Sequence, residues 1–528
     1  MEEKSRRFPI GVQSFAKLRT GDFLYVDKTR YVYDLVHGSS QYFLSRPRRF
    51  GKSLFLSTLK AYWEGKKELF EGLEVEKLEK DNNKAFEPYP VFYFDFNGQN
   101  YQRETALEDV LDKILSSWEA EYSCDGQGTL SDRFQSLLKS AKKKTGKDCV
   151  VLVDEYDKPL LEVLENNTLE EHNKAVFKGF FGTLKSYDEY LRFVFITGVT
   201  KFSKVSIFSD LNQLNDISLN EKYGGICGIT EPELLATFGP EIKKLGEKNG
   251  TTSEGCLQEL RKMYDGYHFA PQSPGVYNPF SLLMAFDNLD FGAYWFSTGT
   301  PSFLVRRLKN MQYDIKKFET GEIYATPFSI TDYRAENPDI LPLLYQTGYL
   351  TLQGYDARRK RYALKFPNEE VKYGLLEGLL PAYSPRAIQG RGADIFSLED
   401  CLESGDTEGM RDILTALFAS IPYTADDAPF EHYFQSVLYI VFTLLGQYVH
   451  CEVHSSRGRA DCILETDKFV YIFEFKVGKS AREALEQIEA KGYAAPYAAD
   501  KRQVFEIGVS FDGEERKLAE WEVREIIQ

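Results

Sequence analysis

Residues 41–63 have the sequence QYFLSRPRRFGKSLFLSTLKAYW, and they decide the fold of the N-terminal half. A short apolar segment is followed by a basic loop and then by apolar residues that recur with the period of a helix. Strand, loop and helix in this order form a cradle for phosphate. Gly51, Lys52 and Ser53 match the end of the motif GxxxxGK[ST], in which backbone N–H groups surround phosphates, the lysine reaches the β/γ oxygens and the hydroxyl binds Mg²⁺.

The first glycine of this motif is absent, because Arg46 occupies its place. The pattern is therefore only half of the general motif. A basic turn that precedes a helix, with no nucleotide bound, would explain the same residues. Two further segments bear on the choice between these interpretations.

Residues 149–159, CVVLVDEYDKP, predict a strand that ends in paired acids. The run of β-branched and apolar residues is typical of a parallel strand buried on both faces. At the carboxyl end of such a strand Asp154 can hold Mg²⁺ through water, and Glu155 can polarise the attacking water. The alternative is a strand that ends in a solvated acidic turn.

Residues 190–210 predict another buried strand, whose exit presents Thr197, Thr200 and Lys201. A polar group at this exit could sense the γ-phosphate of a nucleotide.

Two more strands are expected at 90–97, PVFYFDFN, and at 214–219, LNDISL. Helical stretches such as residues 105–122 alternate with the strands. This alternation predicts an α/β fold: a doubly wound parallel sheet with its phosphate site at the carboxyl edge.

These segments resemble the bacterial AAA-ATPase-like family over about residues 6–220. The resemblance lies in residues 8–36, 43–59, 150–160 and 196–212. Members of that family carry the same Arg-Pro-Arg-Arg-Phe-Gly-Lys-Ser loop, so Arg46 agrees with the family. The resemblance implies that ATP is bound with Mg²⁺. The candidate nucleotide-binding residues are Arg49, Gly51, Lys52, Ser53, Asp154 and Thr197, with Ser53 and Asp154 as metal ligands and Glu155 as a catalytic residue.

The middle of the chain predicts a helical lid and a winged-helix-like connector. Thr230 and Glu233 predict a capping box that begins a helix. Residues 339–371 predict a helix and then a two-stranded ribbon, whose tip is Arg-Arg-Lys-Arg at 358–361. That tip could lie along a phosphate backbone and position it without reading sequence. A solvated tip is the alternative.

Residues 458–477, GRADCILETDKFVYIFEFKV, predict a hairpin that brings two acids together. If residues 467–468 form a two-residue turn, Asp461 lies directly opposite Glu474. Opposed side chains have Cβ atoms about 5 Å apart, where like charges repel each other. A divalent cation between them would reverse the sign of this interaction.

The strand alternation places Lys476 on the same face as Glu474, with Phe475 pointing away into the core. Two carboxylates and a main-chain carbonyl can hold Mg²⁺, while the lysine positions or deprotonates water for phosphodiester cleavage. A surface hairpin with ordinary charges is the alternative. A longer loop would shift the pairing, because Asp-Lys is not a strong type I′ turn.

The same residues resemble the PD-(D/E)XK nuclease superfamily over about residues 405–515, and most closely the subgroup fused behind AAA-ATPase-like domains. The segment GRAD supplies Asp461, FEFK supplies Glu474 and Lys476, and the preceding helix supplies Glu431. The resemblance implies that Asp461, Glu474 and Lys476 are catalytic. It also implies that Glu431, Asp461 and Glu474 bind Mg²⁺, or Mn²⁺ in its place.

Gln487 and Tyr493 resemble the Gln/Tyr helix of some relatives, but their spacing differs, so a core role is equally open. Lys491 is the better candidate for a phosphate contact. A hard cation prefers oxygen ligands, and we assign no catalytic role to His432, His450 and His454.

Composition limits the partners of the chain. Its 528 residues carry a net charge of −15, so any nucleic acid must be met by local basic patches or bound cations. Seven cysteines without a CxxC pair fit reduced thiols. The N-terminus lacks an apolar signal core, and no apolar run of about 18 residues occurs. We expect a cytoplasmic protein with no membrane partner.

We expect three domains: AAA-ATPase-like at 1–229, lid and connector at 230–400, and nuclease-like at 401–528. The leading hypothesis is an ATP-binding enzyme, an ATPase and nuclease, in which nucleotide state controls Mg²⁺-dependent cleavage of nucleic acid, with DNA expected. The alternatives are a nucleotide-switched binding or signalling protein with an inert nuclease fold, and an ATPase whose turnover is the main activity. Assembly is left open, with a homo-oligomer among the expected states.

Overall fold

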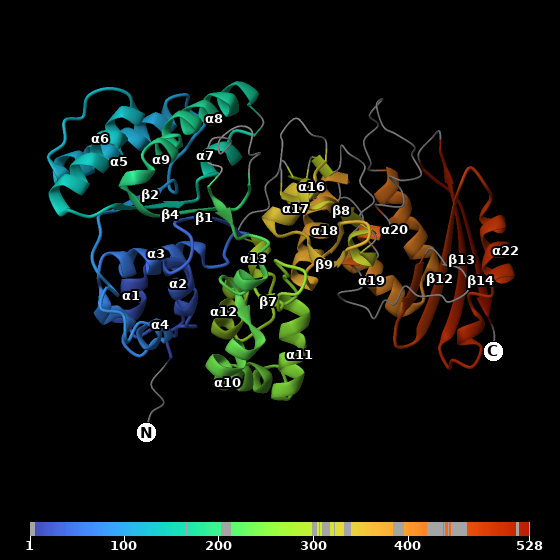
Figure 1. Ribbon diagram of the computed structural model, residues 1–528. Helices are drawn as coiled ribbons and strands as arrows, with labels where there is room; N and C mark the ends of the chain where they lie inside the picture. The colour runs from blue at the N-terminus through green and yellow to red at the C-terminus, as the bar shows by residue number, and fades with distance from the viewer. Residues whose placement is uncertain are drawn as a thin grey trace. The chain divides into compact units, whose positions relative to one another are not determined.

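The computed structural model divides the chain into two compact units, residues 1–295 with 320–371 and residues 296–319 with 372–528. Figure 1 shows their elements. The described residues are 6–164, 166–201, 213–297, 304–305, 307–308, 317–321, 323–331, 339–383, 395–419, 437, 439–441, 443–444, 462–513 and 517–526. None of the helices in these ranges is both long enough and apolar enough to span a lipid bilayer.

The first unit contains a five-stranded parallel sheet in the order β2-β3-β4-β1-β5. All five predicted strands are present, and β3 is buried at every position, as its apolar run predicts. Because β4 lies between β1 and β3, its end separates the loop after β1 from the acids after β3. The strands are β1 (Gln41–Ser45), β2 (Val91–Asp95), β3 (Cys149–Asp154), β4 (Leu191–Gly198) and β5 (Asn215–Asp216).

Helices cover both faces of this sheet, which makes it doubly wound as predicted (Figure 1). One face carries α1 (Phe15–Thr20), α2 (Thr29–Val36), α3 (Lys52–Trp63) and α4 (Glu74–Leu78). The other carries α5 (Ala106–Tyr122), α6 (Leu130–Thr145), α7 (Lys158–Leu161), α8 (Asn167–Phe181) and α9 (Thr183–Ser186).

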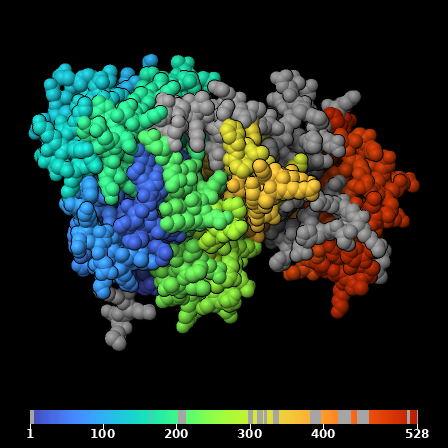
Figure 2. Space-filling model, viewed as in Figure 1, coloured from blue at the N-terminus to red at the C-terminus, as the bar shows by residue number. Residues whose placement is uncertain are grey.

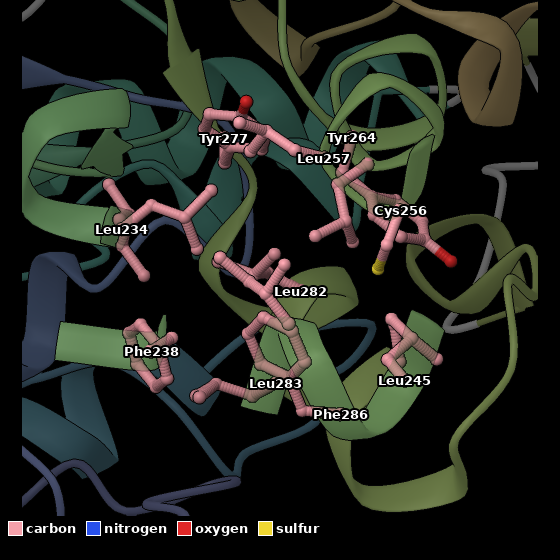
Figure 3. Packing of buried hydrophobic residues seen from close by; sticks show 14 residues of the cluster. Leu234, Phe238, Leu245, Cys256, Leu257, Tyr264, Tyr277, Leu282, Leu283 and Phe286 are labelled. Carbon is pink, nitrogen blue, oxygen red and sulfur yellow. The ribbon is translucent and has the colours of Figure 1, made fainter. Parts of the chain in front are cut away.

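A helical cluster follows the sheet and has a core of its own (Figure 3). The predicted capping box is confirmed: the carboxylate of Glu233 accepts from the N–H and the hydroxyl of Thr230, both at 2.8 Å. The cluster consists of α10 (Glu231–Lys248), α11 (Ser253–Tyr264) and α12 (Pro279–Asn288), with the short strands β6 (Ile229–Thr230) and β7 (Val276–Tyr277).

The predicted helix and two-stranded ribbon are also present, and one further strand joins them in an antiparallel sheet of order β8-β10-β9. The helix α17 before the ribbon is buried at six of its seven residues. The elements are β8 (Ile323–Ala325), α16 (Pro327–Thr331), α17 (Leu341–Thr347), β9 (Thr351–Asp356) and β10 (Arg361–Lys365). Three helices have residues in both units: α13 (Tyr294–Ser297), α15 (Lys317–Thr320) and α18 (Glu369–Tyr383).

The second unit contains a mixed sheet of order β11-β12-β13-β14 that lies between α20 and α22 (Figure 1). The strands β12 and β13 are parallel, and α22 is the crossover between them. The elements are α19 (Ile395–Ser404), α20 (Thr407–Ala419), β11 (Cys462–Glu465), β12 (Phe469–Val477), α22 (Ala481–Lys491), β13 (Gln503–Asp512) and β14 (Lys517–Ile526).

The predicted hairpin register is confirmed where β11 and β12 are described. Cys462 pairs with Phe473, as a two-residue turn at 467–468 requires. Phe475 is half-buried and packs against Phe511 on the face opposite Glu474, so the predicted alternation holds while Phe475 keeps partial solvent contact.

Two neighbouring leucines of α10 allow the helical core to be tested. Leu234 is fully buried in the cluster of Figure 3, whereas Leu235 is 49% exposed. We expect Leu234→Ala to lower the free energy of unfolding by about 2–5 kcal/mol, because it leaves a cavity. Leu235→Ala should change it by less than about 0.5 kcal/mol. Urea titration followed by circular dichroism measures both, and equal losses would contradict the packing.

Candidate functional site

The loop between β1 and α3 is anchored by the buried side chain of Arg46. Its guanidinium donates to the carbonyl oxygens of Ser45 and Ser218 at 2.8 Å and of Tyr223 at 3.0 Å. It also lies 4.1 Å from the ring centre of Phe269. Burial lowers the pKa of Arg46. The arginine that replaces the first glycine of the general motif is therefore a structural anchor.

The remaining loop residues fix its path. Positive φ angles occur at Arg49 (68°) and Gly51 (91°), and at Gly51 a glycine meets this requirement without strain. Between them Phe50 is buried, with its ring centre 4.7 Å from that of Tyr267. The turn thus directs Phe50 inward and leaves the Arg49 side chain exposed, over the ring of Phe280.

The side chain of Lys52 lies inside the loop and donates to its backbone carbonyl groups. Its ammonium donates to the carbonyl oxygens of Arg46 at 3.0 Å and Pro47 at 3.1 Å, and the residue is only 5% exposed. Ser53 is the next residue of α3 and is half-buried. A lysine held at the centre of such a loop is placed to exchange carbonyl partners for phosphate oxygens.

Asp154 and Glu155 lie at the carboxyl end of β3. Asp154 is 1% exposed, pairs in register with Asp95 of β2, and accepts a hydrogen bond from the hydroxyl of Tyr93 at 3.3 Å. Glu155 has a φ of 48°, a left-handed conformation that is uncommon for a residue with a side chain. Such strain often accompanies a functional position.

The carboxyl of Asp154 is suited to a cation. Burial raises its pKa to about 6; Ser53 opposes the shift, and the charges of Glu155 and Asp95 add to it. Its Oδ1 atom is buried and accepts no hydrogen bond from the described residues. A buried oxygen without a donor, close to a hydroxyl, is a donor set that Mg²⁺ favours. Asp154 and Ser53 therefore fit the predicted metal site.

The end of β4 lies between the loop and the acids. The hydroxyl of Thr197 donates to the carbonyl oxygen of Leu44 at 2.9 Å, which ties β4 to β1. Asp157 accepts from the N–H of Thr200 at 2.6 Å and from its hydroxyl at 2.7 Å. Burial raises the pKa of Asp157. The sequence interpretation gave Asp157 no role, although it is the third acid of the segment DEYDKP.

Lys201 connects this edge to α17. Its ammonium forms an ion pair with Asp216 of β5, and its N–H donates to the side-chain oxygen of Gln346 at 2.7 Å. The amide of Gln346 in turn donates to the carbonyl oxygen of Ile330 at 2.9 Å. A small pocket beside this network is lined by Arg46, Lys201, Asp216 and Gln346, among others. Nothing in the sequence pattern indicated Gln346.

In the second unit, Glu474, Lys476 and Gln487 form a closed hydrogen-bonded group. The ammonium of Lys476 donates to Glu474 Oε1 and to the side-chain oxygen of Gln487, both at 2.8 Å. The amide of Gln487 donates to the same carboxylate oxygen of Glu474. Glu474 is 2% exposed. The helix α22 therefore brings Gln487 to the two residues of β12, a role that sequence spacing had left open.

Close packing of α22 on the sheet makes this arrangement possible. Gly508 pairs with Glu474, and a Cβ atom on it would lie 2.1 Å from the carbonyl oxygen of Ala481. Tyr493 is buried in the hydrophobic cluster beside α22, which gives it a core role, and Lys491 is exposed.

Several predicted residues lie outside the described residues: Glu431, Asp461, His432, His450 and His454. Across the described ranges, no group of three or more His, Cys, Asp or Glu side chains is arranged to hold a metal ion. The described part of the second unit thus contributes the carboxylate of Glu474 to the predicted site.

The anchor role of Arg46 can be tested against its exposed neighbour Arg48. Arg46→Ala removes the donor of three carbonyl groups, and each of the two buried ones, on Ser218 and Tyr223, then costs about 1–3 kcal/mol. We expect it to lower the unfolding free energy of the first unit by at least about 2 kcal/mol, whereas Arg48→Ala should change it by less than about 0.5 kcal/mol. Thermal denaturation measures both, and similar melting temperatures would contradict the anchor.

Comparison with known proteins agrees with both halves of this description. A family described as "Predicted AAA-ATPase" matches residues 9–208, and the PD-(D/E)XK nuclease superfamily matches residues 429–521. A protein of Azotobacter chroococcum mcd 1, described as "Uncharacterized protein in vnfD 5'region", is 36% identical over 526 residues, which cover 97% of this chain and 98% of that protein. The chain thus belongs to the family of predicted AAA-ATPases that carry a C-terminal domain of the PD-(D/E)XK nuclease superfamily.

Proposed function

We propose that this protein binds ATP and that its nucleotide state controls a Mg²⁺-dependent nuclease domain that cleaves DNA. The observation that carries the proposal is the group of Glu474, Lys476 and Gln487, in which a buried carboxylate holds an ammonium at 2.8 Å on one face of β12. A buried charge pair of this kind is costly to maintain, so its presence beside the hairpin favours a chemical role.

Continued by one step beyond the pair Cys462 and Phe473, the same register would put Asp461 opposite Glu474. Asp461 and Glu474, with Glu431, would hold Mg²⁺. The cation, when bound, supplies Lewis-acid chemistry by polarising the scissile phosphate.

Within this site the ammonium of Lys476 would orient the attacking water; it would take up the proton of that water only from its neutral amine form, because an ammonium has no lone pair. The side-chain oxygen of Gln487 holds the ammonium on its second side, which fixes the direction of its remaining proton. Gln487 is thus a positioning residue: it restrains both Lys476 and Glu474 from α22.

In the nucleotide site, Lys52 would exchange the carbonyl oxygens of Arg46 and Pro47 for phosphate oxygens. The loop N–H groups and Arg49 would surround the phosphates, and Ser53 with Asp154 would hold Mg²⁺. Glu155 would orient the attacking water, and Thr197 would contact the γ-phosphate from β4. Support comes from the buried Oδ1 of Asp154, which has no donor among the described residues.

Removal of either side chain of the Glu474–Lys476 pair should abolish cleavage. Loss of a positioned acid or base costs about 10²–10⁴ in rate, so Glu474→Gln and Lys476→Ala should leave no measurable cutting of plasmid or oligonucleotide DNA in Mg²⁺ or Mn²⁺. Lys468→Ala, in the exposed turn of the same hairpin, is the matched control and should cleave normally. Cleavage that survives both site changes would place the chemistry elsewhere.

Control by nucleotide can be separated from chemistry with Lys52 and Glu155. Lys52→Ala should weaken ATP binding in calorimetry, and Glu155→Gln should bind ATP without hydrolysing it, because the water is no longer polarised. DNA cleavage measured with and without ATP should respond to ATP in the wild type and lose that response in Lys52→Ala. An unchanged response would contradict control. Calorimetry should also compare Mg²⁺ binding by the wild type and by Asp461→Ala. If the two bind Mg²⁺ equally, the alternative of a nucleotide-switched binding protein with an inert nuclease fold is favoured.

A further inference from the structure

Exposed aromatic side chains gather at the sheet β8-β10-β9. In the described part of the chain five large hydrophobic residues are exposed, and three of them belong to this sheet or to α16, which packs beside β8. They are Tyr324 (45% exposed), Phe328 (69%) and Tyr355 (41%). Exposed aromatic clusters of this kind often mark an interaction site.

The ring of Tyr324 is not needed for the core of the sheet, whereas Tyr355 pairs with the inner-face residue Tyr362, with 4.9 Å between the ring centres. The inner face of the sheet is filled by other residues, which are buried: Ile323, Ala325, Leu352, Tyr362 and Leu364. On the outer face Ala363 pairs with Tyr324 on one side and Gly354 on the other. A Cβ atom on Gly354 would meet nothing within 4 Å. The outer face is therefore a shallow shelf of small residues beside the ring of Tyr324.

The same sheet is strongly basic although the chain is acidic. Residues 351–365 contain five basic side chains and one acid, a local net charge of +4 against −15 for the whole chain. The acid, Asp356, lies 3.6 Å from Arg359 and 3.8 Å from Arg361. The residues Arg358, Arg359 and Lys360 at the tip are exposed, which leaves cationic groups in contact with solvent. Figure 2 shows this region, coloured yellow to orange, at the surface.

A guanidinium and a ring are stacked on the outer face. Arg361 lies with its guanidinium carbon 3.6 Å from the ring centre of Tyr324. Alternation along β10 puts Arg361 and Ala363 on the same face, so the stack stands at the border of the shelf. Guanidinium planes and tyrosine rings are the surfaces on which unpaired bases stack in complexes with single-stranded nucleic acid.

We propose that this aromatic–basic surface, made of Tyr324 and Arg358–Arg361, binds single-stranded nucleic acid. The guanidinium and ammonium groups contact the phosphates, and a base stacks at the ring of Tyr324 and the guanidinium of Arg361. A duplex offers its phosphates but not its base faces, so it uses only part of the surface. The inference rests on the proposed function for the identity of the polymer, but it requires no activity of the nuclease residues.

The test measures binding of the full chain in EDTA, so that cleavage does not interfere. Affinity is measured by fluorescence anisotropy with a labelled oligodeoxythymidine of about 16 nucleotides. This length covers the largest site sizes of small single-strand-binding domains. Tyr324→Leu should weaken this binding by about 5- to 150-fold, the range for loss of one stacked base, while affinity for a duplex of equal length changes little. Tyr324→Phe should restore binding, because the ring is retained.

Removal of tip charges should act differently. Arg358→Ala with Arg359→Ala should reduce the dependence of binding on salt, by about 0.7 in the logarithmic slope for each lost phosphate contact, measured between about 50 and 200 mM. Lys243→Ala, an exposed lysine of α10, is the matched control and should leave the slope unchanged. Thermal melts of every variant confirm that the sheet is folded.

Two outcomes would overturn the inference. One is equal affinity of wild type and Tyr324→Leu for the oligonucleotide. The other is a self-association in sedimentation experiments that Tyr324→Leu abolishes while oligonucleotide binding persists, which would make the surface a protein interface. Binding that depends on Tyr324 in a wild type that cannot cleave DNA would retain this inference and remove the nuclease proposal.

Discussion

The buried guanidinium of Arg46 is the interaction on which the first unit depends. A cation taken out of water is costly unless it is compensated, and here three carbonyl oxygens accept from its two terminal nitrogens while the ring of Phe269 lies 4.1 Å away. The carbonyl groups come from β1 and from the segments that follow β5, and Phe269 comes from the segment after α11. One side chain thus joins the sheet to the helical cluster and fixes the shape of the loop between β1 and α3.

That fixed loop lies at a sheet edge where charge accumulates. Asp154 and Asp157 are both buried, burial raises the pKa of each, and Lys201 with Asp216 forms an ion pair nearby. Asp157 is compensated by hydrogen bonds from Val199 and Thr200, whereas Asp154 Oδ1 has no donor among the described residues, so a cation bound there would stabilise its charged form. The second unit differs, because Glu474 already has the ammonium of Lys476 as a partner. The buried carboxylate of Glu474 is thus paired with a cation of the protein, whereas Asp154 has an oxygen without a donor among the described residues.

Local signals in the sequence were sufficient to predict these strands and this helix. Buried apolar runs identified the five parallel strands, the pair Thr230 and Glu233 identified the start of α10, and a two-residue turn gave the register of β11 with β12. The contacts that define the sites were not local. Gln346 reaches Lys201 across 145 residues, and Gln487 reaches Glu474 only because α22 packs closely over Gly508. Such contacts depend on tertiary packing, which residue spacing does not encode.

The helix α17 connects the loop between β1 and α3 to the ribbon of β9 and β10. At one end Gln346 accepts the N–H of Lys201, and Gly348 approaches so closely that a Cβ atom would lie 2.8 Å from Pro47 of the loop. Three residues later β9 begins, and it leads to the basic tip. A shift of the loop that moved α17 would therefore also move the ribbon. If the two proposed sites are coupled through α17, the coupling is reciprocal: nucleic acid on the ribbon would change the affinity for nucleotide by the same factor by which nucleotide changes the affinity for nucleic acid.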